Sequence, residues 1–98
     1  MHVITRKRLR EFSARHQDAV RPLDAWFQIM RRKRYANPSE VKADFPTATF
    51  LGATKTVFNI GGNKYRLVVN VRYDLGRVYI RHVLTHEEYD EMTAKGAL

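Results

Sequence analysis

The chain has 98 residues, and its 18 Lys and Arg outnumber its 10 Asp and Glu, giving a formal net charge of +8. This length predicts one domain, residues 1–98, which buries roughly 60 to 70 % of the surface exposed in the unfolded chain. The sequence has no cysteine, which excludes disulfides and thiolate metal sites and fits a reducing compartment.

The sequence contains no signal-peptide apolar region and no apolar run near the ~18 residues of a membrane span. We therefore expect a soluble, cytoplasmic protein with no membrane contact. The excess of positive charge favours a polyanion, nucleic acid or the ribosome, over the alternative that a basic surface serves only solubility.

Residues 2–5 alternate in the manner of a short strand, and Thr5 is placed to cap a helix that begins at Arg6. Apolar or aromatic residues then recur at helical spacing: Leu9, Phe12, His16 and Val20. The remaining positions of this helix are mostly basic, which predicts a basic outer surface.

A second helix is predicted from Pro22, because proline is well tolerated in the first turn. Its apolar stripe indicates core packing rather than a platform for stacking bases: Leu23, Trp26, Phe27 and Met30. The basic run 31–34 closes this helix, where cations complement the negative end of the helix dipole. Contact with phosphate is an equal alternative for this run.

The segment Asn37-Pro38-Ser39-Glu40 predicts a capped helix from Pro38 to about Asp44, which Pro46 stops, followed by a connector over 47–54. From Lys55 the hydrophobic period changes to two, which predicts three antiparallel strands near 55–61, 64–73 and 78–84 and then a helix over 85–95. The expected fold is α+β, with an antiparallel sheet, two N-terminal helices packed on one face and a short C-terminal helix.

Gly62-Asn63 predicts a two-residue turn with positive φ at both positions, which sets the register of the first two long strands. Lys55 then faces Asn70, and Asn59 faces Arg66, all on one face. The opposite face is apolar and must be covered by the N-terminal helices.

For the third strand we expect Asn70 opposite Arg81 and Arg66 opposite Thr85, since a slip of one residue would turn Arg81 into the core. A three-residue loop before this strand would reverse that register. His82 then falls on the apolar side and is expected to serve packing.

Thr85-His86-Glu87-Glu88 is a capping box, so His86 begins the last helix, where the positive dipole end favours an anion. The predicted register places His86 beside Arg66, on the face that carries Lys55 and Arg81. These types predict a phosphate site in which the imidazole can move a proton. Tyr89 either lines this site or fills the core, and the histidines lack metal-ligand spacing.

Four segments resemble, in order and spacing, the HigB family of bacterial toxins, distant relatives of the RelE toxins: MHVITRKRLREF, NPSEVKADFP, VFNIGGNKYRLVV and YIRHVLTHEEYD. The resemblance covers nearly the whole chain. It implies a type II toxin–antitoxin toxin that cuts translated mRNA on the ribosome without a metal or other cofactor. A cognate HigA-like antitoxin would hold it inactive.

The resemblance also implies the reaction, in which the ribose 2′-OH attacks the adjacent phosphate and leaves a 2′,3′-cyclic phosphate and a 5′-hydroxyl. Such chemistry needs proton transfer and cations around the phosphorane. We assign His86 as general acid or base and Arg66 and Arg81 as the groups that hold the phosphorane charge. Lys55 is assigned to phosphate, and the remaining assigned residues position RNA: Asn59, Asn70 and Tyr89.

Two other functions stay open from the residues alone. One is a non-catalytic toxin like the ParE relatives that inhibit gyrase, which would need neither His86 at a helix start nor two arginines near it. The other is a small RNA-binding module, which predicts stacking aromatics on the polar face, where Tyr79 is one of few.

Overall fold

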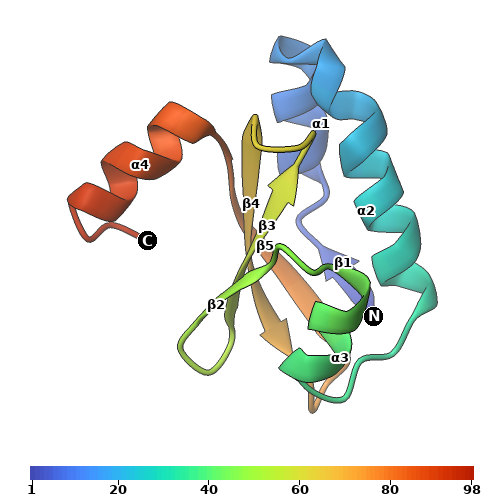
Figure 1. Cartoon of the computed structure of the whole chain (residues 1–98). Helices are drawn as coiled ribbons and strands as arrows, with labels where there is room; N and C mark the ends of the chain where they lie inside the picture. The colour runs from blue at the N-terminus through green and yellow to red at the C-terminus, as the bar shows by residue number, and fades with distance from the viewer.

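The computed structural model describes residues 1–98, which form one five-stranded sheet with helices on both sides (Figure 1). The predicted α+β class and the order of the long elements are confirmed. The elements are β1 (His2–Ile4), α1 (Lys7–Arg15), the 3₁₀ turn η1 (Gln17–Ala19), α2 (Val20–Arg32), α3 (Pro38–Asp44), β2 (Thr49–Leu51), β3 (Lys55–Ile60), β4 (Tyr65–Arg72), β5 (Arg77–Thr85) and α4 (His86–Ala94).

The sheet is mixed, in the order β1-β5-β4-β3-β2, and not the purely antiparallel sheet expected from the sequence. β1 runs parallel to β5, with Val3 beside Val78, and β2 forms within the predicted connector and pairs antiparallel with β3. The short strand predicted over residues 2–5 is thus confirmed as β1, whereas β2 was not predicted, because its three residues are too few for an alternation pattern to define.

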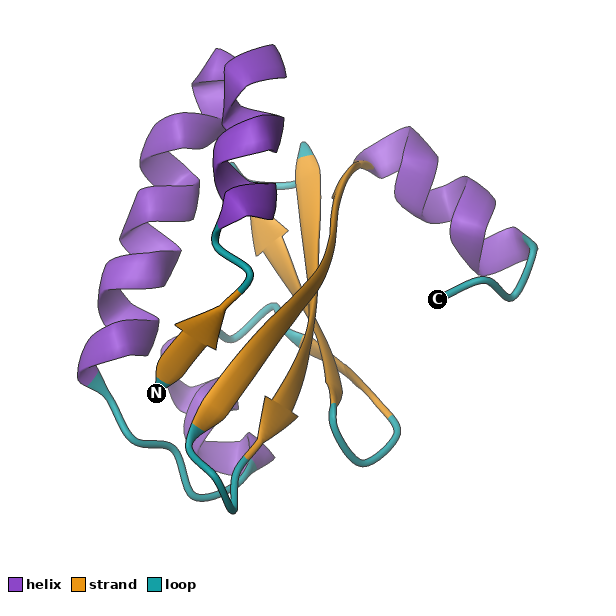
Figure 2. Ribbon diagram, turned by 180° about the vertical axis from the view of Figure 1, so that it is seen from behind, coloured by secondary structure: helices purple, strands orange, loops and turns teal.

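The helices α1, α2 and α3 lie on one side of the sheet, and α4 lies on the other (Figures 1 and 2). The first two helices and the sheet share one hydrophobic core, as predicted. From the helices this core includes Leu9, Phe12, Leu23, Trp26, Phe27 and Met30, and from the three long strands Phe58, Ile60, Tyr65, Leu67, Val69, Val71, Val78 and Ile80. No helix of the structure has the length and apolar character that a membrane crossing would need.

The start of α1 differs from the prediction. Thr5 has a φ of 73° and gives no side-chain cap, and the helix is entered through Arg6 instead. The helix ends at Arg15, before the η1 turn, and α2 already begins at Val20. Val20 is therefore an exposed helix start and not the end of the first apolar stripe.

The two predicted caps of the short helices are confirmed. The Asn37 side chain accepts a hydrogen bond from the Glu40 backbone N–H at 3.0 Å. At α4, Thr85 Oγ1 accepts from the Glu88 N–H at 3.2 Å, and the Glu88 carboxylate accepts from the Thr85 N–H at 2.8 Å. These bonds fix where both helices begin.

The register of β3 and β4 is confirmed, with Lys55 opposite Asn70 and Asn59 opposite Arg66. The turn between them differs, because the residues with positive φ are Gly61 and Gly62 and not Asn63. Only glycine adopts this conformation at little cost, so the two glycines carry the reversal.

The predicted register of β4 and β5 was wrong. Arg66 lies opposite Leu84 and not Thr85, and Asn70 lies opposite Tyr79 and not Arg81. A β-bulge at Arg81 separates the Val69–Ile80 pair from the Val68–His82 pair. A bulge shifts the alternation by one residue, so Arg81 stays out of the core while the residues after it exchange faces.

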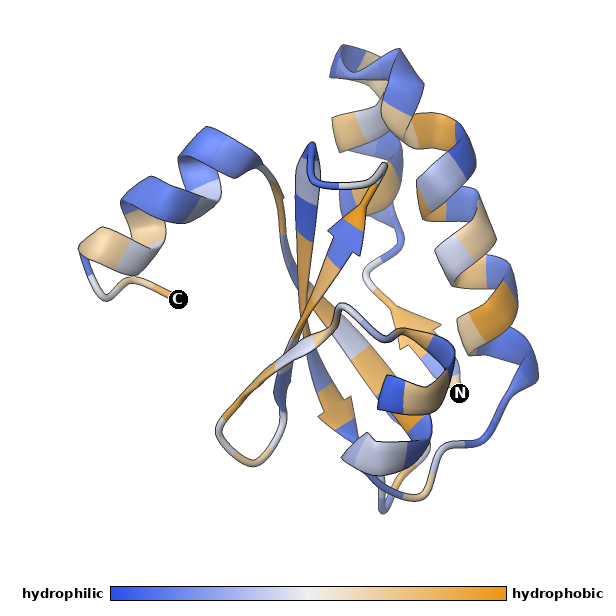
Figure 3. Cartoon of the chain, in the orientation of Figure 1, coloured by the Kyte–Doolittle hydropathy of each residue, from blue (hydrophilic) through white to orange (hydrophobic).

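The face opposite α1 and α2, here called the open face, is also partly covered. Tyr89, Met92 and Leu98 pack against a small apolar group formed by Val57, Val68 and Leu84. Figure 3 shows a hydrophilic first part of α4 and apolar colour toward the C-terminus, which matches this contact. The open face is thus a shallow surface with an apolar centre and polar ends.

Candidate functional site

Four of the predicted site residues lie around the end of the sheet next to the β3–β4 turn, here called the hairpin-end cluster: Asn59, Arg66, His86 and Tyr89. Three of them hydrogen-bond to the segment 63–65 that follows the β3–β4 turn. The Asn59 amide donates to Asn63 Oδ1 at 3.3 Å, Arg66 Nη1 donates to the Asn63 and Tyr65 carbonyls at 3.1 and 3.2 Å, and the His86 backbone N–H donates to the Lys64 carbonyl at 3.0 Å. The fold therefore gathers residues from β3, β4 and α4.

Tyr89 joins this cluster through Arg66, because the Arg66 Cζ lies 5.7 Å from the centroid of the Tyr89 ring. This distance is within the range of a cation–π contact. Only Nη1 of Arg66 is used by the backbone carbonyls, so its other nitrogens are free to bind an anion. Tyr89 is half-buried and both lines the cluster and packs on the sheet, which joins the two roles predicted for it.

His86 is exposed at the first position of α4, and its Nδ1 lies 3.0 Å from Asp90 Oδ2. The carboxylate favours one orientation of the ring and leaves Nε2 free for proton transfer. The His86 imidazole lines a surface groove together with His16, at the end of α1, and Lys64, between β3 and β4. No hydrogen bond or ion pair links it to Arg66 or Arg81.

The start of α4 is a weaker anion site than the sequence suggested. The Thr85–Glu88 capping box and the bond from the His86 N–H to Lys64 use most of the free backbone donors. Glu87 and Glu88 also place two carboxylates in the first turn. The cations of the sheet, and not the helix dipole, therefore provide the main attraction for phosphate.

The other predicted residues lie beyond the apolar centre of the open face. Lys55 and Asn70 face each other across β3 and β4, and the Asn70 amide donates to Thr54 Oγ1 at 3.0 Å. Arg81 occupies the β5 bulge and is exposed, and its carbonyl accepts from Arg8 Nη1 at 3.0 Å. The structure therefore divides the predicted site into two basic regions and does not join Arg81 to His86.

His82 is the residue that the sequence interpretation missed. It lies opposite Val68 on the open face and not in the core. Partial burial lowers its pKa below 6.5, and the positive charges of Arg8, Arg81 and Lys55 lower it further, so the imidazole is neutral near pH 7. Two successive polar residues, Arg81 and His82, before two apolar ones were the sequence signal for the bulge.

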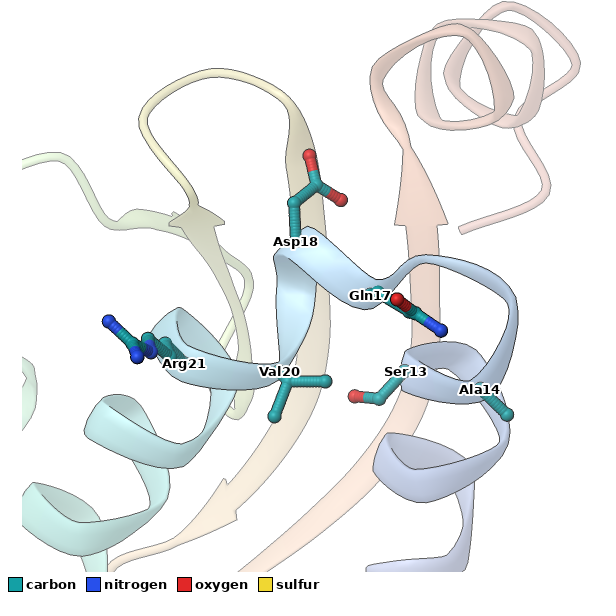
Figure 4. Close-up of a pocket in the computed structure, with 6 residues that line it drawn as sticks. All are labelled: Ser13, Ala14, Gln17, Asp18, Val20 and Arg21. Carbon is teal, nitrogen blue, oxygen red and sulfur yellow. The ribbon is translucent and has the colours of Figure 1, made fainter.

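One further hollow of the surface does not gather a comparable set of groups. A hollow at the corner between α1 and α2 is lined by Ser13, Ala14, Gln17, Asp18, Val20 and Arg21 (Figure 4). In this view Asp18 and Arg21 point away from each other, and Asp18 is engaged by Lys64 at 2.8 Å. The structure contains no group of three or more His, Asp or Glu side chains placed to hold a metal ion.

A five-stranded sheet with three helices on one side and a short helix after the last strand is consistent with the class of small RelE-like toxins. The chain belongs to the HigB toxin family: the family model described as the RelE-like toxic component of a toxin–antitoxin system matches residues 19–92. The resemblance inferred from the sequence motifs is thereby confirmed.

Curated relatives cover almost the same length. The mRNA interferase toxin HigB of Escherichia coli (strain K12) and the mRNA interferase HigB of Shigella flexneri are each 36 % identical over 96 residues, which is 96 % of this chain and 92 % of each relative. The mRNA interferase HigB of Escherichia coli O6:H1 is 24 % identical over 95 residues, covering 95 % of this chain and 92 % of its own.

Proposed function

We propose that the chain is the toxin of a type II toxin–antitoxin system and an endoribonuclease that cuts mRNA on the translating ribosome. The observation that carries this proposal is the hairpin-end cluster of a HigB family member, in which Arg66 contacts Tyr89 and lies beside Asn59, next to the helix start that carries His86. The relatives named mRNA interferases support the same activity over nearly the whole chain.

The reaction is a transesterification within the RNA. A base takes the proton of a ribose 2′-OH, the 2′-oxygen bonds to the adjacent phosphorus, and the bond from phosphorus to the 5′-oxygen breaks as that oxygen receives a proton. The products are a 2′,3′-cyclic phosphate and a 5′-hydroxyl. Catalysis therefore requires positioned proton-transfer groups and cations that bind the transition state better than the substrate.

In this proposal His86 is a proton-transfer group, oriented by Asp90, and Arg66 binds the developing phosphorane charge with its free nitrogens. Tyr89 holds Arg66 and, with Asn59, positions the nucleotide. The second basic region continues the phosphate contacts through Lys55, Asn70 and Arg81. Because Arg81 lies beyond the apolar centre, it acts on the strand at a distance from His86.

The partners follow from the family and the charge. A cognate antitoxin, encoded for this toxin, holds it inactive, and the ribosome presents the mRNA. The net charge of +8 favours binding to the mRNA and to the ribosomal RNA, because binding releases their counterions. We place this action in the cytoplasm and assign it to residues 1–98 as one domain.

The test adds purified protein to a bacterial translation extract and maps new 5′ ends on a defined mRNA. We expect cuts that carry 5′-hydroxyl ends and appear only with active ribosomes. His86→Ala should lower the cutting rate roughly 10²- to 10⁴-fold if His86 transfers a proton.

The matched control is His2→Ala, which removes another exposed histidine far from the hairpin-end cluster. Wild-type protein that is folded but makes no cuts would contradict the nuclease proposal and favour a ParE-like binding toxin. Cutting that falls less than tenfold in folded His86→Ala would contradict the role of His86 alone.

A further inference from the structure

The β5 bulge brings basic side chains from three elements to one half-buried imidazole. Arg8 reaches from α1 and donates Nη1 to the Arg81 carbonyl at 3.0 Å, so the bulge itself fixes the position of its guanidinium. Lys55 and Arg81 both act electrostatically on His82, from β3 and from β5. Because these residues are far apart in the chain, the fold and not a local charge run assembles the group.

These cations have no counterion in the structure. The ion pairs of the protein join Lys33 to Asp44, Lys64 to Asp18, Arg72 to Asp74 and His86 to Asp90, and none of them includes Arg8, Lys55 or Arg81. Like charges held close together repel one another unless an anion lies between them. A cluster that the fold keeps unneutralised is therefore suited to binding an anion.

A groove along the α1 side of β5 extends the cluster. It is lined by His82 and Leu84 of β5 and by Arg8 and Arg15 of α1, with Glu11 as its one carboxylate. Two guanidiniums one helical turn on either side of Glu11 leave the groove with positive charge in excess. The groove is open to solvent, as an extended polymer requires.

His82 lies on the same open face as Arg66, whereas Arg8 reaches the bulge from α1 on the other side of the sheet. Arg66 is opposite Leu84, and His82 is two residues further along β5, which is about 7 Å for an extended strand. This separation is comparable to the distance between neighbouring phosphates of a single strand. An RNA strand bound at the hairpin-end cluster can therefore place its next phosphate at the bulge.

We propose that Arg8, Arg81 and Lys55 form, around His82, a second phosphate-binding subsite that holds the mRNA strand beside the hairpin-end cluster. The subsite rests on the proposed function, because its ligand is the RNA being cut. Arg15 extends it along the groove. His82 contributes its proton equilibrium: a bound phosphate offsets the neighbouring cations and makes the protonated imidazole more favourable.

The test measures binding of a short fluorescent 2′-O-methyl RNA, which cannot be cut because it has no free 2′-OH. We expect Arg15→Ala to weaken binding severalfold and to lower the slope of log affinity against log salt by about 0.7 for the lost contact. Arg15 makes no side-chain hydrogen bond, so its loss does not disturb the bulge. Arg8→Ala should act in the same direction.

Arg10→Ala is the matched control, because it removes the same charge from the same helix at a groove on the α2 side. If Arg10→Ala weakens RNA binding as much as Arg8→Ala and Arg15→Ala do, the subsite is overturned, since only overall charge would then matter. Unchanged RNA binding in both of those variants would overturn it too.

The second readout is pH. Phosphate binding raises the pKa of His82, so wild-type affinity should rise as the pH falls from about 8 to about 5, whereas His82→Gln should lose this rise. A rise that persists in His82→Gln contradicts the role of His82. The groups that face it are Arg8, Glu11 and Arg15 of α1, Lys55 of β3 and Arg81 of β5.

A parallel sedimentation assay with mRNA-free ribosomes separates the two sources of phosphodiester. If Arg8→Ala and Arg15→Ala weaken only ribosome binding and not oligonucleotide binding, the ligand is ribosomal RNA and the mRNA assignment is overturned. The proposed function is tested separately, by the cuts that wild-type protein makes in the translation extract.

Discussion

The Arg66 guanidinium lies over the Tyr89 ring, with its Cζ 5.7 Å from the ring centroid. This contact joins β4, the middle strand of the sheet, to α4. It depends on two features that the sequence alone did not provide. The bulge in β5 sets the register that brings Leu84 opposite Arg66, and the contact of α4 with the sheet places Tyr89 above it. The contact of α4 lies at the proposed cleavage site, and the bulge lies in the second basic region.

Replacing Arg66 by alanine should lower the rate of mRNA cutting about 10²- to 10³-fold, as expected for loss of a group that binds transition-state charge. The measurement is the rate of 5′-end formation in the translation extract. Arg77→Ala, which removes an exposed arginine at the start of β5, is the control for charge. If both variants lose activity equally, Arg66 has no specific role.

Tyr89 can be tested by separating its ring from its hydroxyl. Tyr89→Phe keeps an aromatic face for Arg66 and should change the cutting rate less than about threefold, whereas Tyr89→Leu should lower it about 3- to 30-fold, since a cation–π contact contributes roughly 0.5 to 2 kcal/mol. The reverse order, with Phe as harmful as Leu, would instead give the hydroxyl the chemical role.

Asp18 should make the stability of the protein depend on acid pH. Hydrogen bonds from Lys64 and then from Tyr65 lower the pKa of Asp18 below its ordinary value of 3.8. The folded carboxylate therefore stabilises the protein above that pH, and this contribution is lost as the pH falls through the lowered pKa. Asp18→Asn should reduce the free energy of unfolding at pH 7.

The measurement for Asp18 is urea unfolding at neutral pH and again in the acid range. The curves of Asp18→Asn and wild type should approach each other in acid, where the native carboxylate is protonated. Asp24→Asn, which replaces a carboxylate outside the ion pairs of the structure, should follow wild type throughout. A loss that is equal at both pH values would show that packing, and not the charge, is responsible.

Thr5 adopts a φ of 73°, which a β-branched residue tolerates poorly. Thr5→Gly should relieve this strain and raise the free energy of unfolding by roughly 0.5 to 1 kcal/mol after the entropy that glycine loses. Thr49→Gly, in the regular strand β2, should destabilise instead. Thermal unfolding decides this, and a lower melting temperature for Thr5→Gly would refute the strain.

Local chemistry made much of this protein predictable. Asn37 and Thr85 cap their helices as expected, because a cap depends on residues three positions apart in the chain. The β3–β4 register was also correct, since a short glycine turn fixes which residues face each other. The conformation of this turn was predicted less well, because the positive φ values occur at Gly61 and Gly62, one residue before the predicted positions.

The tertiary structure decided what alternation cannot encode. A bulge shifts the strand register by one residue, and it forms where the unshifted register would bury a charged side chain. Arg81 therefore stays outside the core, and His82 lies on the open face. Likewise β2 has only three residues and becomes a strand because β3 offers a free edge. The sequence by itself thus determined the long elements, the caps of α3 and α4 and the basic character, because these arise from near neighbours. Packing between distant segments decided which polar residues meet.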